Sequence, residues 1–322
     1  MIKKNKLLII TPVKHLKGFL TKAKKYFKIK YIPNISAKNF KAVSKNYDCL
    51  FTNPNMTNIY LGEENLKGSK IKVICTASTG TIHLEKNFLK KNNIKLISLT
   101  KQKKLLTKLT STAELAFGLT LDAVRNITRS YMSVKDGKWD YTPFIGRMMQ
   151  NQNILVFGYG RLGKMYTKFC LAFGSKVYVY DPFKKIYNKK VIVVKNLWNV
   201  LKNIDVISFN IHAEKKNLNL VDKNFLRKVK KNVIIINTSR GEIINEKDLF
   251  QFLRKNKLAK YYADVLANEI FFKKNLLFKN LVKMHQILIT PHIGGMTIDG
   301  QSLAFDHALN MLINHCKTTN KK

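Results

Sequence analysis

Three side chains in the second half of the chain have types and a spacing that suit proton transfer on a small carboxylic acid. Arg240 follows an apolar run, Glu269 lies 269 − 240 = 29 residues further on, and His292 another 292 − 269 = 23 residues on. An Arg fork can hold both carboxylate oxygens, and a His can exchange a proton near neutral pH. A neighbouring carboxylate would stabilise the protonated ring. Each residue alone also fits a structural role, as a surface ion pair, a solvated loop acid or a hydrogen-bonded turn residue.

A glycine motif earlier in the chain predicts a dinucleotide-binding loop. An apolar run precedes Gly158-Tyr-Gly160-Arg-Leu-Gly163, and Asp181 lies 181 − 160 = 21 residues past the middle glycine, after a second apolar run. Gly158 allows a tight turn, Gly160 lets the backbone approach a pyrophosphate, and Gly163 lets a helix pack closely on the strand. The N–H groups at the helix start would face the phosphates, and Asp181 would accept hydrogen bonds from ribose hydroxyls.

The same glycines also match the start of the phosphate loop of nucleotide triphosphatases. The stretch from Gly158 to Lys164 fits GxxxxGK, but Met165 follows. A thioether cannot replace the Ser or Thr hydroxyl that holds Mg²⁺ in that loop. The motif therefore favours a dinucleotide.

Short β-branched runs predict two parallel α/β units that would position these residues. The first series of predicted strands is 7–10, 29–32, 49–52, 71–76 and 94–97. The second series is 154–157, 177–180, 206–209, 233–237 and 287–290. Apolar spacing predicts a long connecting helix over 112–127 and a final helix over 303–313. Because Arg240 and His292 each follow an apolar run, we expect them at the carboxyl ends of strands, where doubly wound sheets present ligands.

Composition argues against nucleic acid as the main partner. The chain has 322 residues, 45% of them hydrophobic, which is enough for two globular domains. Its net charge is +40, but 59 − 7 = 52 of the basic residues are Lys, and they are spread along the whole chain. A dispersed Lys excess is not a reading face for bases, although its field would attract small anions.

The cysteines and the N-terminal segment predict a reduced, cytoplasmic protein. The four cysteines lie far apart without a CxxC pair, so we expect neither a zinc site nor a disulfide framework. The basic start of the chain carries only four consecutive apolar residues, Leu7 to Ile10. That run is too short for a signal peptide or a membrane span.

Taken in order, the motifs resemble the D-isomer-specific 2-hydroxyacid dehydrogenases across most of the chain, in particular the phosphoglycerate-dehydrogenase-like branch. The motifs are GxGxxG with its acid, Asn237-Thr-Ser-Arg-Gly, Asp264-Val followed by Glu269, and Thr290-Pro-His-Ile-Gly-Gly. The segments Cys75–His83, Ala113–Ala116 and Gly137–Trp139 also look like that family.

The resemblance implies a role for each residue. Arg240 would bind the substrate carboxylate and polarise its carbonyl, while His292, tuned by Glu269, would exchange the proton. Asp264 would contact the nicotinamide carboxamide. The implied substrate contacts are Ser78, Thr79, Gly80 and Arg240, and the implied NAD contacts are Gly158, Gly160, Arg161, Leu162, Gly163, Asp181, Thr238 and Asp264. No metal is expected.

Two positions depart from the family pattern. The family usually has Ser-x-His-x-Pro where this chain has Ser208-Phe-Asn210-Ile-His212, so the loop on the nicotinamide side could differ. The family often has Pro after the catalytic Glu, where this chain has Ile270-Phe-Phe272. Neither departure removes a group that the reaction needs.

The implied fold is α/β, with two Rossmann-like or flavodoxin-like parallel-sheet domains separated by a cleft. Residues 104–293 would form the NAD-binding Rossmann domain, inserted into a substrate domain of 1–103 completed by 294–322. In the family two subunits pair through the segment around 112–150, so we expect a homodimer. The implied reaction is reversible hydride transfer between NAD(H) and a 2-hydroxy or 2-oxo acid.

Three alternatives come from relatives of the same family. One is D-3-phosphoglycerate dehydrogenase itself, acting in serine biosynthesis. Another, formate dehydrogenase, pairs its His with Gln, and Glu269 argues against it. The third is a non-catalytic NAD-sensing corepressor, which could lose catalytic groups and still bind; the intact Arg240, Glu269 and His292 favour an enzyme. With Lys so abundant, the sequence does not indicate which acid is the substrate or whether it carries a phosphate.

Overall fold

The computed structural model describes residues 4–53, 59–81, 83–267, 269, 280 and 282–319. The chain forms two compact units. Unit 1 comprises Met1–Leu109 and Met296–Lys322, and unit 2 comprises Thr110–Gly295. The chain thus leaves unit 1 after residue 109 and returns to it at residue 296. The sequence predicts these two domain boundaries after residues 103 and 293.

Unit 1 contains a parallel sheet in the order β2-β1-β3-β4-β5, as in flavodoxin-like folds. Its strands are β1 (Lys6–Ile9), β2 (Lys28–Tyr31), β3 (Cys49–Thr52), β4 (Val73–Thr76) and β5 (Lys95–Ile97). Its helices are α1 (Phe19–Tyr26), α2 (Ala37–Ser44), α3 (Glu63–Leu66), α4 (Lys86–Lys91), α5 (Lys103–Leu106) and α12 (Ile298–Thr319), with a 3₁₀ turn at Leu99–Lys101.

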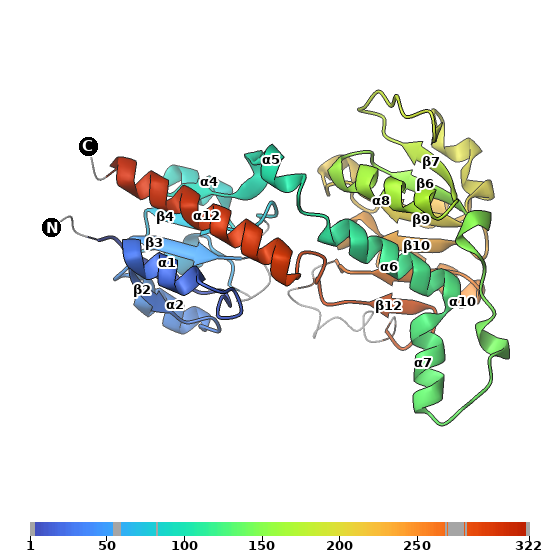
Figure 1. Ribbon diagram of the computed structural model, residues 1–322, viewed down its shortest axis with the longest axis horizontal. Helices are drawn as coiled ribbons and strands as arrows, with labels where there is room; N and C mark the ends of the chain where they lie inside the picture. The colour runs from blue at the N-terminus through green and yellow to red at the C-terminus, as the bar shows by residue number, and fades with distance from the viewer. Residues whose placement is uncertain are drawn as a thin grey trace. The chain divides into compact units, whose positions relative to one another are not determined.

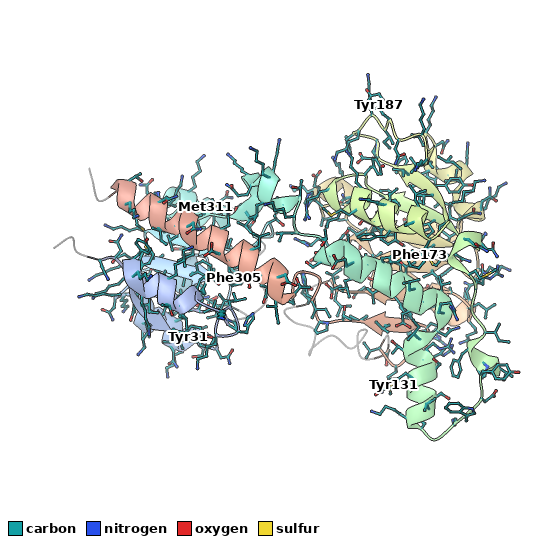
Figure 2. All side chains as sticks on the ribbon, in the orientation of Figure 1. Tyr31, Tyr131, Phe173, Tyr187, Phe305 and Met311 are labelled. Carbon is teal, nitrogen blue, oxygen red and sulfur yellow. The ribbon has the colours of Figure 1, made fainter. Side chains whose placement is uncertain are left out.

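Helices cover both faces of this sheet. On one face α1, α5 and α12, which Figure 1 labels, contribute to a buried cluster with β1, β3 and β4. In this cluster the rings of Phe19, Phe51 and Phe305 meet at centroid distances of 5.2 to 6.1 Å; Figure 2 labels Phe305 on α12. On the other face α2, α3 and α4 bury Phe40, Leu66 and Leu89. The helix α12 is therefore part of the core of unit 1, although it follows unit 2 in the sequence.

Unit 2 contains a parallel sheet in the order β12-β11-β10-β9-β6-β7-β8. Its strands are β6 (Asn153–Phe157), β7 (Lys176–Tyr180), β8 (Ile192–Val193), β9 (Val206–Phe209), β10 (Ile234–Asn237), β11 (Lys260–Ala263) and β12 (Ile287–Ile289). Its described helices are α6 (Ser111–Arg125), α7 (Ile127–Lys135), α8 (Arg161–Ala172), α9 (Lys223–Leu226) and α10 (Glu246–Lys255). Short 3₁₀ turns occur at Thr142–Phe144, Met149–Asn151, Leu197–Asn199, Leu201–Asn203, Lys215–Asn217 and Gly241–Ile243.

This is the doubly wound order of Rossmann folds, with the reversal between β6 and β9. The helices α6 and α8 pack on one face, where Thr120 and Tyr166 share a buried 2.7 Å hydrogen bond, and α9 and α10 pack on the other. The predicted fold class is confirmed. The glycine loop after β6 lies beside the reversal, where such sheets bind ligands.

The elements differ from the predicted ones in three places. The strands β8 and β11 were not predicted. The predicted helix over 112–127 is interrupted, because Asn126 has a left-handed φ of 59° between α6 and α7. Asn tolerates that conformation, and Lys260 Nζ bonds its Oδ1 at 2.6 Å. The final helix is longer than predicted, at Ile298–Thr319.

Across the described part of the chain, no helix combines the length and the apolar character that crossing a membrane requires. The four cysteines are free thiols, and all of them are buried.

Candidate active site

The glycine loop of unit 2 is closely packed at its outer glycines and open at its middle glycine. Gly158 has φ +93°, and a Cβ there would lie 2.5 Å from Ile211 and 2.7 Å from the carbonyl of Asn210. A Cβ on Gly163 would collide with the carbonyl of Gly158. A Cβ on Gly160 would have only one atom within 4 Å, the Nζ of Lys184 at 3.7 Å. Close packing thus requires the outer glycines, whereas the surroundings of the middle glycine are open.

Asp181 is held beside this loop, at the end of β7. Its Oδ2 accepts a 2.8 Å hydrogen bond from the N–H of Tyr159, and its Oδ1 accepts a 3.0 Å bond from the N–H of Phe183. Each oxygen keeps a further lone pair for a ribose hydroxyl. Lys184 also reaches the loop, since its Nζ donates to the carbonyl of Tyr159 at 3.4 Å.

Helix α8 begins at Arg161 without a side-chain cap, so the first N–H groups of the helix, which lack intrahelical acceptors, lie next to Gly160. Leu162 belongs to the same first turn. Burial lowers the pKa of Arg161, as expected for a cation held partly out of water. This turn therefore suits a phosphate group.

Arg240, Asp264 and His292 follow the neighbouring strands β10, β11 and β12 at their carboxyl ends. The sheet thus places the predicted substrate cation, an acid and the predicted proton donor along one edge. Thr238 lies between β10 and Arg240 and is buried.

Two contacts fix the loop that carries Arg240. Its backbone carbonyl accepts a 3.0 Å bond from the Asn237 side chain, and its Nη1 donates to the carbonyl of Ser239 at 2.6 Å. A Cβ on Gly241 would collide with the backbone of Leu266, so this loop packs directly on the segment leading to Glu269. Arg240 is half-buried, and its guanidinium has five N–H donors. The one bond to the Ser239 carbonyl therefore orients the guanidinium and leaves other N–H groups that can bond a carboxylate.

His292 and Glu269 form the central pair of the site. Nδ1 of His292 lies 2.7 Å from Oε1 of Glu269, and the two side chains are 26% and 25% exposed. The carboxylate therefore fixes the ring orientation, and the other ring nitrogen, Nε2, lies on the opposite side of the ring. The residue types and the resemblance to the dehydrogenase family both predict this pairing.

Asp264 anchors the backbone on both sides of His292. Its Oδ1 accepts bonds from Thr290 Oγ1 (2.5 Å) and the Ile293 N–H (2.7 Å), and its Oδ2 accepts one from the Gly294 N–H (2.7 Å). Burial raises the pKa of Asp264, and these hydrogen bonds oppose the rise. His292 has φ +55°, an uncommon value for a residue other than glycine. The Asp264 carboxylate holds this conformation in place.

The predicted substrate loop lies in unit 1, after β4. Ser78 Oγ donates to the carbonyl of Gly80 at 2.6 Å, and the Ser78 carbonyl accepts the N–H of Leu99 at 3.1 Å. The Thr79 carbonyl accepts a 3.3 Å bond from Thr100. The segment after β5 thus supports the loop.

The two departures from the family pattern have different outcomes. Asn210 bonds locally, with Nδ2 at 3.1 Å from both the carbonyl and the Oγ of Ser208. His212 is exposed, and its carbonyl accepts a 2.6 Å bond from Asn217. Residues 270–272 lie outside the described part of the chain.

Two supporting residues were not predicted. Ser239 Oγ donates to the carbonyl of Phe209 at 2.6 Å and accepts the N–H of Ile211 at 3.2 Å, which ties the loop after β9 to the loop of Arg240. Glu246 is buried and accepts the N–H of Ala267 at 2.9 Å. The position of Ser239 next to Arg240 in the motif could have indicated its supporting role. Nothing in the sequence distinguishes Glu246 from an acidic residue on the surface.

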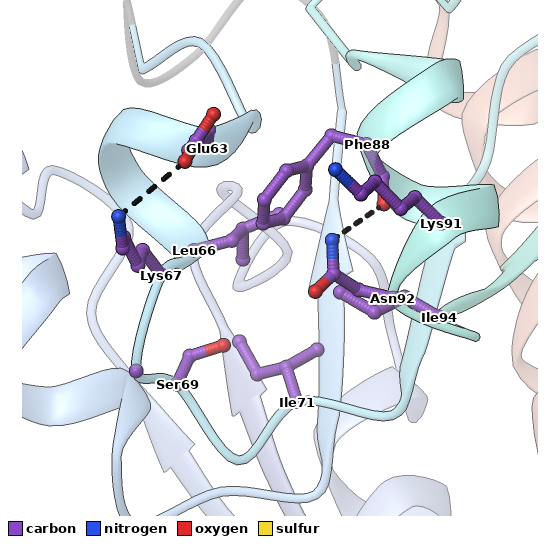
Figure 3. A pocket seen from close by; sticks show the side chains of 10 residues that line it. Glu63, Leu66, Lys67, Ser69, Ile71, Phe88, Lys91, Asn92 and Ile94 are labelled. Atoms are coloured by element: carbon purple, nitrogen blue, oxygen red, sulfur yellow. Dashed lines mark hydrogen bonds and ion pairs between the residues drawn. The ribbon is translucent and has the colours of Figure 1, made fainter.

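A hollow of about 300 Å³ lies elsewhere, in unit 1, between α3 and α4 (Figure 3). Leu66, Ile71 and Phe88 line it, and a 3.5 Å ion pair between Glu63 and Lys67 lies at its rim. It opens where β4 and β5 begin, the opposite end of these strands from Ser78–Gly80, so we do not assign it to the reaction. Among the described residues no cluster of three or more His, Cys, Asp or Glu side chains could hold a metal ion.

Comparison with known proteins matches a family model to most of unit 2. The model is the NAD binding domain of the D-isomer specific 2-hydroxyacid dehydrogenases, and it matches residues 117–294.

Relatives and a solved structure extend the likeness. Hydroxypyruvate reductase of Thermotoga maritima is 30% identical over 234 residues, which cover 73% of this chain and 74% of that protein. D-3-phosphoglycerate dehydrogenase of Archaeoglobus fulgidus is 34% identical over 193 residues, 59% of this chain but only 36% of that protein. The crystal structure of a D-lactate dehydrogenase from Aquifex aeolicus, with NAD and lactic acid, covers 98% of this chain and 96% of its own, with a TM-score of 0.82 and 24% identity. This last likeness concerns the fold.

Proposed function

The chain belongs to the D-isomer-specific 2-hydroxyacid dehydrogenase family of NAD-dependent enzymes, and from that premise we propose that Arg240, Glu269 and His292 carry out its reaction on a small 2-hydroxy or 2-oxo acid. The 2.7 Å contact between His292 Nδ1 and Glu269 Oε1 carries this proposal. Since a non-catalytic binding protein has no need of an oriented His–carboxylate pair, the contact supports an enzyme over a corepressor.

Each group has a distinct role in the proposed reaction. NAD, when bound, supplies or takes the hydride at the substrate C2. Arg240 holds the carboxylate and draws charge from the carbonyl oxygen, because its planar fork can bond both groups. His292 holds the exchanged proton on Nε2, since Nδ1 is engaged by Glu269. The loop of Ser78, Thr79 and Gly80 contributes N–H groups to the carboxylate.

A substrate panel tests the proposal. Lactate, glycerate, 2-hydroxyglutarate and 3-phosphoglycerate would be oxidised with NAD, and the matching 2-oxo acids reduced with NADH. We expect turnover of at least one D-acid with no turnover of its L-isomer. Preference for 3-phosphoglycerate would identify the phosphoglycerate dehydrogenase alternative. Tight NADH binding without turnover of any acid would favour the corepressor instead.

We expect NAD to be preferred over NADP because Asp181 stands where the adenosine ribose would bind. Its carboxylate would repel a 2′-phosphate, and juxtaposed like charges cost several kcal/mol, so kcat/KM should favour NAD by at least roughly tenfold. Asp181→Ala should narrow this kcat/KM ratio, because NADP is no longer repelled and NAD loses its bonds to the ribose hydroxyls. Lys184→Ala is the matched control, because it removes the nearby cation; it should increase the preference for NAD over NADP. Equal kcat/KM for both cofactors in the wild type would refute the assignment.

We further propose that the protein is a homodimer that pairs through residues 127–148 of unit 2. Large apolar side chains are exposed there: Trp139 is 92% exposed, Tyr141 81%, Ile145 75% and Tyr131 60%. Figure 2 labels Tyr131 of this group. An exposed apolar patch of this kind is typical of an interface.

Trp139→Asp should therefore shift the protein from dimer to monomer at micromolar concentration, because an interface core does not tolerate an unpaired charge. Sedimentation velocity measures the change. Tyr187→Asp is the control, since Tyr187 is 83% exposed but lies outside this segment. A wild-type monomer, or a Trp139→Asp variant that stays dimeric, would exclude this surface.

A further inference from the structure

Two buried cysteines from distant parts of the sequence lie side by side in unit 1. Cys49 is the first residue of β3, and Cys316 lies in the last turns of α12, 267 residues later. Their sulfur atoms are 3.7 Å apart, within thiol hydrogen-bonding distance. The two residues are only 1% and 6% exposed. The fold thus creates a dithiol that the spacing of the cysteines did not predict.

The surroundings make Cys316 the reactive member of the pair. Hydrogen bonds from the Cys49 thiol and, to a smaller extent, from the Asn5 side chain lower the pKa of Cys316 to about 7, against the effect of burial. The same contact and burial raise the pKa of Cys49. Cys316 is also three residues from Thr319, where the described part of α12 ends. Local opening of a terminal helical turn costs little, so this sulfur can be reached from solvent.

We propose that Cys49 and Cys316 form a modification site at which low-molecular-weight disulfides, such as oxidised glutathione, produce an intramolecular disulfide. The Cys316 thiolate attacks one sulfur of the small disulfide, forming a mixed disulfide and releasing one small thiol. Cys49, after losing its proton, then attacks the Cys316 sulfur and releases the second small thiol. Two protein thiols are oxidised, one small disulfide is reduced, and the two protons end on the released thiols.

The geometry favours this pair over the other cysteines. A disulfide needs a sulfur separation of about 2.05 Å, so the two atoms must approach by about 1.7 Å from 3.7 Å, which side-chain rotation and a small shift of the end of α12 can supply. Cys75 lies nearby, but its thiol donates to the carbonyl of Ala308 at 3.4 Å, and burial raises its pKa. Cys170 lies in unit 2, where burial also raises its pKa.

The disulfide would have a structural consequence for unit 1. The helix α12 belongs to the part of the chain that returns to unit 1 after residue 295, and it is held there by packing of side chains such as Phe305, Leu309 and Leu312. A covalent bond from its end to β3 would close a loop that includes all of unit 2. Cross-links that close long loops stabilise the folded state by restricting the unfolded chain.

Peptide mapping of the folded wild-type protein tests the site directly. The protein is equilibrated with graded mixtures of oxidised and reduced glutathione, quenched with acid, alkylated, digested and analysed without reduction. We expect one linked pair of peptides, containing Cys49 and Cys316, with Cys75 and Cys170 recovered as alkylated thiols. A stable glutathione adduct on Cys316, a linkage to Cys75, or no linkage without denaturant would each overturn the proposal.

Thermal unfolding provides a second measurement that does not depend on activity or NAD. Oxidation should raise the Tm by several degrees, and dithiothreitol should reverse the rise. Cys316→Ser and Cys49→Ser should each abolish the oxidation-dependent rise, while Cys170→Ser should keep it. An unchanged wild-type Tm after oxidation would contradict the stabilising effect. If a serine variant fails to fold, the wild-type peptide map still decides the question.

Discussion

Replacing His292 with Ala should lower kcat for carbonyl reduction on the order of 10²–10⁴-fold, which is the usual loss when general acid catalysis is removed. His292 is placed for this role by Glu269 at 2.7 Å and by the Asp264 bonds to the following two N–H groups. NADH affinity should change little, because the glycine loop follows a different strand, β6. Stopped-flow NADH oxidation and fluorescence titration of NADH separate the two effects.

Two variants serve as controls for this prediction. His212→Ala should be nearly neutral, because His212 is exposed and its described contact uses only the backbone carbonyl. Glu269→Gln removes the negative charge but keeps the size of the side chain and an oxygen that can accept from Nδ1 of His292, so it should reduce kcat by less than His292→Ala does. If His292→Ala were fully active while His212→Ala was not, His212 would be the proton donor instead.

The direction of the reaction adds a pH signature. Carbonyl reduction consumes the proton of an imidazolium, whereas alcohol oxidation needs neutral imidazole. The optimum for reduction should therefore lie at lower pH than the optimum for oxidation. Coincident optima, with proton transfer shown to be rate-limiting by a solvent isotope effect, would count against His292 as the exchanging group.

The sequence was most informative where a motif and a buried strand coincide. In three places a β-branched run is followed by a residue of distinct chemistry. These residues are Gly158, Asp181 and Arg240. The strands that were missed lack this contrast. The strand β8 has two residues, both exposed, and β11 reads Lys-Tyr-Tyr-Ala. The pairing of β11 with β10 and β12 supplies what its own sequence does not indicate.

The conformation of His292 shows a second limit of sequence reasoning. Its positive φ depends on hydrogen bonds that the N–H groups of Ile293 and Gly294 donate to the Asp264 carboxylate, which lies 29 and 30 residues earlier in the sequence. Local propensity allows His in the left-handed region but does not require it there. The contact between Cys49 and Cys316 has the same origin, because only the return of α12 to unit 1 brings the two residues together.

Arg240→Lys should lower kcat/KM for the acid by about 10²-fold or more although the positive charge is kept, a loss comparable to removing one donor that stabilises a developing oxyanion. A guanidinium presents parallel N–H groups that can bond carboxylate and carbonyl together, whereas an ammonium is a point charge on a flexible stem. The shorter reach of Lys would also lose the 2.6 Å bond from Nη1 to the Ser239 carbonyl, which orients the wild-type side chain.

The kinetic pattern distinguishes this explanation from a general loss of structure. NADH affinity and Tm should stay close to wild type, because the backbone of the Arg240 loop is held by the Asn237 side chain and by the packing of Gly241, neither of which is changed. Arg227→Lys is the matched control, since Arg227 is an exposed Arg of unit 2 and should tolerate the exchange. If Arg240→Lys retained near-normal kcat/KM, charge alone would suffice, and two-point recognition of the acid at this position would be wrong. If it lost NADH binding as well, Arg240 would act mainly on the cofactor, and the substrate carboxylate would need another cation.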